Sequence, residues 1–468
     1  MLRVTPTAPE PERFDVAIIG TGSGNSLLTP DHDGLKVAIV ERDVFGGTCL
    51  NRGCIPTKMF VYAADIAETV RHSSRYGVDA RLDTVRWNDI ADRVFGRIDP
   101  IADGGEDYRK SLDNVTVFNG EARFTGERTL GIRSADGSAR HIAADDIVLA
   151  AGASPRIPPI PGLAEVPYHT SDTILRIREL PRSLIVLGGG FIAAEMAHIF
   201  GGFGVDVTII SRGPLLARED EDISREFTRQ YSDRFTTYLN AGILEAAPGG
   251  DGSVRVEASV DGERVSVAAQ ALLVATGRTP AGEALALNVA GVEVDAAGYV
   301  VTDKFLRTTA PGVWALGDIA NPAQLKHTAN AEARIVAHNL VHPDDLRAID
   351  LWPVPHAVFA GPQIASVGLT EQELRRAGTR AYVTATQHYR DIAYGWAMED
   401  TRNFCKLIAD AETRVLLGAH IIGPNASTLI QQLIQGMRFG QTVDEMARGM
   451  LYIHPALSEL VENALLKL

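Results

Sequence analysis

Two segments of the chain repeat one pattern, in which a short apolar run leads directly into closely spaced glycines. The first pattern spans residues 15–24 and is followed by an apolar run at 37–41 that ends on an acid. The second spans residues 184–190 and is followed by an apolar run at 205–210. A strand, a glycine turn, a short helix and a parallel strand make up a dinucleotide-binding unit. Because the two units lie far apart, the sequence predicts two separate nucleotide domains rather than an array of short repeats.

The first glycine turn carries the residue types that a dinucleotide needs. Gly20 permits the tight turn, and Gly22 lets the backbone approach a pyrophosphate that rests on the helix N-terminus. Glu41, 21 residues after Gly20, can accept hydrogen bonds from ribose hydroxyls. Asn25 stands where the third glycine is usual, with Gly24 before it. An ordinary glycine-rich turn is the alternative to nucleotide binding.

The second unit keeps Gly188 and Gly190 but ends its second strand without an acid. The chain reads Ser211-Arg212 there, and Arg218 comes six residues on. A carboxylate would hold a free 2′-hydroxyl and repel a 2′-phosphate, whereas arginine makes bidentate contacts to phosphate. The sequence therefore predicts NADPH rather than NADH. Two solvated surface arginines are the alternative.

Two of the three cysteines, Cys49 and Cys54, lie five residues apart in the segment GGTCLNRGCIPTK. Zinc would need two more ligands, and no nearby His or Cys supplies them, so no metal site is predicted. A redox-active disulfide at the start of a helix is expected, because a helix N-terminus favours a thiolate. Two buried structural thiols are the alternative. Cys405 lies in the strand-like run NFCKLIAD and is expected in the core.

The segment HPALSE places His454 near the C-terminus, with Glu459 five residues on. Pro455 suits the first position of a helix, so the helix is expected to begin there. A carboxylate one turn away can fix the tautomer of the histidine and raise its basicity, which suits a general acid or base. A helix-capping feature is the alternative.

Composition limits the protein classes that fit these motifs. At roughly 150 residues per domain, 468 residues predict about three domains. The net charge of −14 is spread along the chain, which argues against nucleic-acid and anionic-membrane partners. Neither a signal-peptide core nor an apolar stretch of 18 residues occurs. A cytoplasmic α/β protein is expected, with residues 1–13 as a disordered lead-in.

The pattern of expected strands and helices changes in the last third of the chain. Apolar runs at 147–152 and 272–277 each end at a glycine before a proline-containing loop, as strands do at domain crossings. From about residue 351, strand-like runs (HAVF, QIASVG, CKLIAD, VLLGAHIIG) precede helical patterns at 426–439 and 456–467. The predicted fold is therefore α/β, with two Rossmann-like domains and a C-terminal α+β domain.

Together these motifs resemble the class I flavoprotein disulfide reductases, which include glutathione reductase and dihydrolipoamide dehydrogenase. The resemblance runs from Phe14 almost to the C-terminus, and GGTCLNRGCIPTK is its most specific part. TTAPGVWALGD, ending at Asp318, is similar to the second flavin motif of the family. HPALSE is similar to the segment whose histidine reaches the disulfide of the other subunit. The resemblance thus implies FAD, NADPH, a small-molecule disulfide substrate, and a homodimer with a composite active site.

The resemblance also implies a role for each matching residue. Cys54 is the thiol on the flavin side and Cys49 is the interchange thiol. The implied catalytic residues are Cys49, Cys54, His454, Glu459, Lys58 and Glu195, with the last two paired near flavin N5. Implied FAD contacts are Gly20, Gly22, Gly24, Glu41, Gly47, Thr48, Lys58, Gly152, Gly317 and Asp318. Implied NADPH contacts are Gly188, Gly190, Phe191 (an aromatic lid), Ile192, Glu195, Ser211, Arg212, Arg218 and Gly277. The implied domains are FAD-binding (14–165 and 284–350), NADPH-binding (166–283) and dimerisation (351–468).

Four positions depart from the family pattern. They leave the local geometry around them open, but none of them removes a reactive group, so the expected class of reaction is unchanged. They are Asn25, Arg52 between the two cysteines, Ala151 and Ala281.

The family members differ in substrate, and the chain offers several indications. Pro30 stands where glutathione reductases carry an arginine for a glutathione carboxylate. Arg212 and Arg218 oppose the NAD-dependent dihydrolipoamide dehydrogenases, and the tail NALLKL lacks the cysteine pair of mercuric reductases. GTGSGNS with CIPTKMFVYAAD most resembles the mycothione reductases of actinobacteria, whose substrate is a neutral sugar–inositol disulfide. Glutathione disulfide and dihydrolipoamide stay open as alternatives. A redox-dead flavin-binding subunit and a transhydrogenase also stay open as alternatives. The presence of both cysteines and His454 argues against these two functions.

Overall fold

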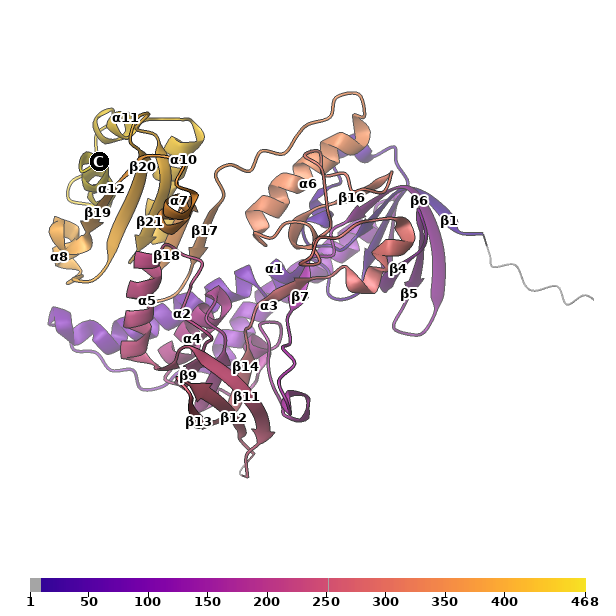
Figure 1. Ribbon diagram of the computed structural model, residues 1–468. Coiled ribbons are helices and arrows are strands. Elements are labelled where there is room, and N and C mark those ends of the chain that lie inside the picture. Colours follow the sequence, from indigo (N-terminus) through magenta and orange to yellow (C-terminus); the bar gives the residue numbers. More distant parts are fainter. Residues whose placement is uncertain (1–9, 251) are drawn as a thin grey trace, which may run out of the picture. The chain divides into compact units, whose positions relative to one another are not determined.

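The computed structural model describes residues 10–250 and 252–468, which form two compact units (Figure 1). The first unit contains the chain up to Pro56, Ala91–Arg156 and Arg278–Leu351, and the second contains Thr57–Ile90, Ile157–Gly277 and Trp352–Leu468. Residues 1–9 of the predicted lead-in lie outside the described residues. The first strand begins at Glu12, two residues before the predicted start of the FAD domain.

The first unit is built on a seven-stranded sheet with the order β3-β2-β1-β6-β5-β4, in which β16 also pairs with β6. Strands β3, β2, β1, β6 and β16 run parallel, while β4 and β5 are antiparallel. The strands are β1 Glu12–Ile19, β2 Val37–Glu41, β3 Val115–Asn119, β4 Glu121–Gly126, β5 Thr129–Arg133, β6 Ala139–Leu149 and β16 Val313–Ala315. Apolar side chains of β1 and β2 are buried on both faces, as expected for a doubly covered parallel sheet. A two-stranded ribbon pairs β7 Ala153–Pro155 with β15 Arg278–Pro280.

Helices supply the layers of this unit. Helix α6 (Lys326–Val341) packs Ala333 and Val336 against apolar side chains of β1 and β2. The short α1 (Gly47–Asn51) comes after β2. Helices α2 (Cys54–His72) and α3 (Trp87–Lys110) continue from one unit into the other.

The short helix predicted after the first glycine turn is wrong. Two 3-10 turns form instead, η1 Gly24–Ser26 and η2 Pro30–His32. Pro30 lacks an N–H to donate into a helix, and it favours extended backbone at the residue before it. Thr29 is extended, with φ −118° and ψ 171°, so a helix cannot continue through this point.

The second unit contains the second nucleotide-binding sheet, with the parallel order β10-β9-β8-β14. Its strands are β8 Ser183–Leu187, β9 Asp206–Ile210, β10 Thr236–Tyr238 and β14 Ala271–Val274. Here the predicted strand, glycine turn, helix and strand are confirmed, because α4 (Phe191–Gly202) begins directly after Gly190. Helix α5 (Glu221–Arg234) comes after β9. An antiparallel sheet of β11 Ala241–Pro248, β12 Val254–Val260 and β13 Glu263–Ala269 completes this part.

The C-terminal part of the second unit is an antiparallel sheet with the order β17-β18-β21-β20-β19. Its strands are β17 Pro355–Val358, β18 Ile364–Gly368, β19 Tyr382–His388, β20 Phe404–Asp410 and β21 Leu416–Ile422. Its helices are α7 Glu371–Ala377, α8 Ala393–Ala397, α9 Ala426–Leu429, α10 Gln431–Arg438, α11 Val443–Arg448 and α12 Ser458–Leu466. Helices α10 to α12 bury their apolar side chains with those of β20 and β21 in one core, which includes the fully buried Cys405. The predictions of a core cysteine and of a C-terminal α+β domain are confirmed.

Two details of this region differ from the predicted pattern. The helix expected at 426–439 is divided at Ile430 into α9 and α10. Helix α11 was not predicted.

Across residues 10–250 and 252–468, we find no helix with the length and apolar character of a membrane span.

Candidate active site

The first glycine turn lies against the start of α1, and two glycines are required there. Gly20 has φ +99°, and a Cβ on it would lie 2.4 Å from the carbonyl oxygen of Ala150. A Cβ on Gly47 would lie 2.6 Å from the Cα of Gly22. Glu41 accepts hydrogen bonds from the Thr21 amide (2.9 Å) and hydroxyl (2.6 Å). The turn, Glu41 and the segment that bears Cys49 therefore form one contiguous site at the carboxyl ends of the parallel strands.

The Asp318 carboxylate indicates whether the residues of this site fit a flavin cofactor. It lies in η8 (Gly317–Ile319), and its carboxylate makes no hydrogen bond or ion pair with any residue in the described ranges. Burial raises the pKa of this carboxyl, and the charges of Arg278 and Lys326 oppose that rise. A half-buried carboxylate without a donor is unfavourable, so a ligand hydroxyl is a suitable partner. The site thus fits FAD, whose ribityl hydroxyls can donate to Asp318.

The two cysteines are brought together by a sharp turn between α1 and α2. Asn51 at the end of α1 donates to the carbonyls of Phe45 (2.9 Å) and Gly47 (3.1 Å). Gly53 lies so close to α1 that a Cβ on it would be 3.0 Å from the Thr48 oxygen. Both cysteines are thiols, with no disulfide bond between them. The neighbouring Cys54 side chain raises the pKa of the Cys49 thiol most, and burial raises it further. Adjacent thiols at the start of a helix can form a reversible disulfide.

Lys58, one helical turn beyond Cys54 on α2, forms an ion pair with Glu195. The Nζ–Oε1 distance is 2.6 Å. The same Glu195 oxygen accepts a hydrogen bond from the Phe359 amide at 2.9 Å, and Lys58 Nζ lies 4.3 Å from the centre of the Phe359 ring. The family resemblance implies this pair, and the structure contains it. Their role near flavin N5 stays a prediction.

Of the side chains expected to contact NADPH, those of Phe191, Arg212 and Arg218 are exposed, whereas those of Glu195 and Ser211 are buried. Gly188 has φ +133°, and a Cβ on it would lie 2.3 Å from the Ala275 oxygen. Phe191 is exposed at the first position of α4. Arg212 and Arg218 are exposed, and neither makes a hydrogen bond or ion pair within the part of the chain that the structure describes. Two unengaged guanidinium groups after β9 are suited to a phosphate.

Directly after Arg218, the chain is held by buried charges that sequence analysis did not find. Glu219 accepts hydrogen bonds from His356 (2.7 Å) and Ser366 (2.6 Å) in the C-terminal sheet. Asp220, which is fully buried, pairs with Lys406 of β20 at 2.9 Å. Lys406 also contacts the carboxylates of Asp222 and Glu371, at 2.6 Å each. We call Glu219, Asp220 and the side chains that bind them the Glu219–Asp220 anchor.

His454 and Glu459 are paired as the sequence predicts, but the helix begins later. His454 Nδ1 lies 2.7 Å from Glu459 Oε1, and the Ala456 amide donates to Glu459 Oε2 at 3.2 Å. The hydrogen bond from His454 lowers the pKa of Glu459. Helix α12 starts at Ser458, so the expected start at Pro455 is wrong. The Glu459 carboxylate holds residues 454–456 as a bend ahead of the helix.

The segment around His454 exposes large apolar side chains. Leu451 is 99% exposed and Ile453 is 75% exposed, while the His454 side chain is 72% exposed. Apolar side chains gathered on one segment indicate a surface that is covered by another protein. The geometry is therefore suited to presenting His454 to a second subunit.

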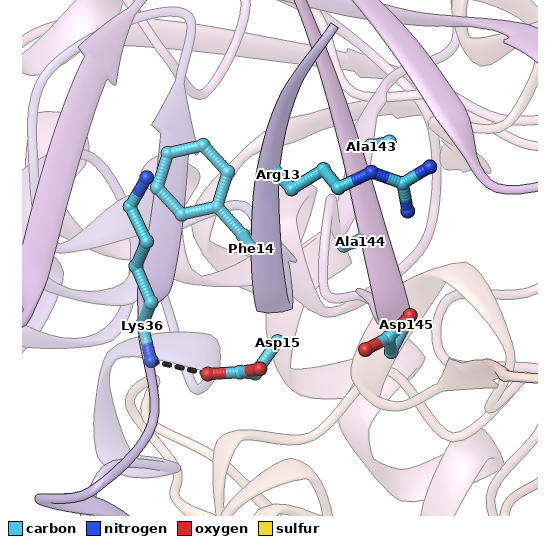
Figure 2. Close-up of a pocket in the computed structure, with 7 residues that line it drawn as sticks. All are labelled: Arg13, Phe14, Asp15, Lys36, Ala143, Ala144 and Asp145. Carbon is cyan, nitrogen blue, oxygen red and sulfur yellow. Dashed lines mark hydrogen bonds between the residues drawn. The ribbon is translucent and has the colours of Figure 1, made fainter.

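A surface pocket of the first unit lies near the amino ends of its parallel strands, away from the first glycine turn (Figure 2). It has a volume of about 200 Å³ and is lined by Arg13, Phe14, Asp15, Lys36 and residues 143–145. The Lys36 amide donates to Asp15 at 2.6 Å (Figure 2). These residues lie towards the amino ends of β1 and β2. Dinucleotides bind at the carboxyl ends of parallel strands, so this pocket is not the candidate site.

Comparison with known proteins decides the family. The model of the pyridine nucleotide-disulphide oxidoreductase family matches residues 14–333, and that of its dimerisation domain matches residues 354–465. The chain belongs to this family. It is 49% identical to mycothione reductase of Mycobacterium tuberculosis over 470 residues, covering 98% of this chain and 100% of that protein. It is 34% identical to dihydrolipoyl dehydrogenase of Chlorobaculum parvum, covering 97% and 96% of the two chains.

A solved structure agrees with this assignment. The HOCl-induced flavoprotein disulfide reductase RclA from Escherichia coli superposes with a TM-score of 0.83 at 30% identity, covering 96% of this chain and 99% of that chain. The chain is therefore a flavoprotein disulfide reductase that uses FAD and NAD(P)H, as its motifs predict. The dimerisation domain supports the predicted homodimer. The redox-dead alternative is not supported.

Proposed function

We propose that this enzyme uses NADPH to reduce mycothione to two molecules of mycothiol, and so maintains a cytoplasmic thiol pool. The neighbouring Cys49 and Cys54 thiols carry this proposal, on a chain 49% identical to a mycothione reductase over its length. Pro30 in place of a carboxylate-binding arginine supports a substrate that carries no charge there. Arg212 and Arg218 support NADPH.

The residues of the first unit would hold FAD by backbone approach and by carboxylates. A Cβ at Gly20 or Gly47 would collide with backbone atoms of the protein, so these two glycines allow the close packing of the turn on which a diphosphate would rest. Glu41 and Asp318 are positioned to accept hydrogen bonds from sugar and ribityl hydroxyls. FAD held by these residues would supply a two-electron path from the pyridine nucleotide to the Cys49–Cys54 disulfide.

The reduced cysteine pair would then exchange with the substrate disulfide. The Cys49 thiolate attacks one sulfur of mycothione, forms a mixed disulfide and releases the first mycothiol. Cys54 attacks Cys49 in turn, releases the second mycothiol and restores the protein disulfide. Each released thiolate takes up one proton.

Proton transfer to and from the substrate sulfurs needs an acid–base group beside Cys49. Cys54 and burial both raise the pKa of the Cys49 thiol, which disfavours the attacking thiolate. A nearby cation reverses this tendency. We assign that role to His454 of the partner subunit, held in one tautomer by its Glu459 neighbour. It accepts the Cys49 proton and later donates it to the leaving mycothiol.

A substrate panel tests the proposed function. NADPH oxidation by the holoenzyme is measured at matched concentrations of mycothione, glutathione disulfide and lipoamide. We expect kcat/KM to be highest for mycothione. A higher kcat/KM for glutathione disulfide or lipoamide would assign the enzyme to that substrate instead.

Coenzyme choice gives a second prediction. Arg212→Ala is expected to raise the KM for NADPH about ten- to a hundredfold, because a charge-assisted contact contributes roughly 1.5–3 kcal/mol. The KM for NADH should barely change. Arg182→Ala is the matched control. Arg182 is exposed in the same domain, but it immediately precedes β8 and so lies at the amino ends of the strands, away from the glycine turn. Equal losses with both coenzymes would show that Arg212 does not contact the 2′-phosphate.

A further inference from the structure

The two glycine turns of this protein lead into different local structures. The second leads into the 12-residue α4, whereas the first leads into η1, which has three residues. A full helix presents aligned amide groups and a partial positive charge at its N-terminus, and these normally hold a diphosphate. A single 3-10 turn provides little of this charge. The first turn therefore needs positive charge from elsewhere if it is to hold a dianionic diphosphate.

Lys326 brings one such charge to the turn. It is the first residue of α6, and its Nζ donates to Ser23 Oγ at 2.9 Å. Ser23 in turn donates to Asn330 Oδ1 at 3.0 Å, which fixes the serine between two residues of α6. An ammonium group has three N–H donors, so Lys326 keeps donors for a ligand. Among the described carboxylates, none forms an ion pair with it.

Arg109 brings the second charge, from the last turns of α3. Its Nε donates to Asn25 Oδ1 at 2.7 Å and its Nη2 to the Asn25 carbonyl at 2.5 Å. Arg109 is only 9% exposed, and no carboxylate in the described ranges pairs with it. A buried cation without a counter-ion is unfavourable unless an anion binds beside it. Asn25 is the position where the family pattern has glycine, so the departure and the arginine occur together.

We propose that Lys326 and Arg109 hold the diphosphate of FAD at the first glycine turn, in place of the missing helix N-terminus. Lys326 donates directly to a phosphate oxygen, and Arg109 supplies charge from behind Asn25. The charge of Lys326 opposes the rise in pKa that burial causes at both Asp318 and Cys49, so its ammonium lies among the groups of the cofactor site. This inference depends on FAD as the cofactor and is independent of which disulfide is reduced.

The test measures FAD retention by the holoenzyme. Lys326→Met and Arg109→Met are compared with Lys304→Met and Arg97→Met, which alter exposed residues of the same unit. Released FAD is measured by its fluorescence during titration with bromide salt. We expect each site variant to raise the FAD dissociation constant about ten- to a hundredfold, and the control variants to leave it unchanged. Lys326→Arg and Arg109→Lys keep the charge and should restore most of the retention. Retention by Lys326→Met equal to that of Lys304→Met would overturn the proposal.

A second measurement separates the diphosphate from the flavin ring. The ³¹P resonances of bound FAD should shift in Lys326→Met holoenzyme and stay in place in Lys304→Met. Unchanged ³¹P resonances together with an altered flavin absorption spectrum would place Lys326 at the ring and overturn the assignment. Circular dichroism of each variant shows whether the fold is intact. If Arg109→Met does not fold, the Lys326 series decides the outcome. If it folds and retains FAD as well as Arg97→Met does, the part assigned to Arg109 is overturned.

Discussion

Replacing Cys49 with serine is expected to abolish reduction of mycothione while NADPH-driven reduction of an artificial electron acceptor continues. Serine cannot form the disulfide that receives electrons, and it cannot form a mixed disulfide with the substrate. The loss should therefore be complete rather than partial. The acceptor reaction needs neither step. Both activities are measured as NADPH oxidation by the same holoenzyme preparation.

Cys405→Ser is the matched control for this prediction, because Cys405 is fully buried in the C-terminal core. It should keep both activities and alter stability only. Full disulfide turnover by the Cys49→Ser enzyme would contradict the assignment of the interchange thiol.

Replacing His454 with glutamine is expected to slow disulfide reduction by roughly 10²–10⁴-fold, the usual contribution of general acid–base catalysis. Reduction of the flavin by NADPH should stay near its normal rate. Cys54 and burial raise the pKa of Cys49, and loss of the imidazolium removes a charge that lowers it. The thiolate should therefore form only at higher pH. The long-wavelength absorbance of the two-electron-reduced enzyme, recorded against pH, measures this shift.

The dimeric site is tested by mixing two inactive chains. A Cys49→Ser chain and a His454→Gln chain form heterodimers in which one composite site is intact. About half of the activity per dimer should return. Heterodimers that are demonstrated to form but recover no activity would show that His454 does not act across the subunit interface.

Sequence predicted those parts of the site in which local chemistry and spacing suffice. The glycines at 20 and 188 are required by contacts with the adjacent strand ends, which any dinucleotide fold must contain. The His454–Glu459 pair needed only a short sequence separation. Lys58 and Glu195, which lie far apart in sequence, could be paired through the family resemblance alone.

The parts that sequence could not predict depend on tertiary partners. The helix predicted after Gly24 does not form, because Pro30 and the extended Thr29 outweigh the general pattern of the fold. Arg109 gave no signal, because it lies in a polar helical segment and its partner Asn25 is 84 residues away. Lys406 is a charge inside an apolar strand, which predicts a buried counter-ion but not which one.

The Glu219–Asp220 anchor separates coenzyme preference from the integrity of the fold. Arg212 and Arg218 are exposed and make no hydrogen bond or ion pair with the residues that the structure describes, whereas the two acids that come after them are fixed by His356, Ser366 and Lys406. A mutation at either arginine thus alters a ligand contact and leaves the buried network intact. In an evolving lineage, NADPH and NADH preference can be exchanged by surface substitutions whose stability effects are small. The same loop is therefore a permissive place to engineer the coenzyme, provided that Glu219 and Asp220 are kept.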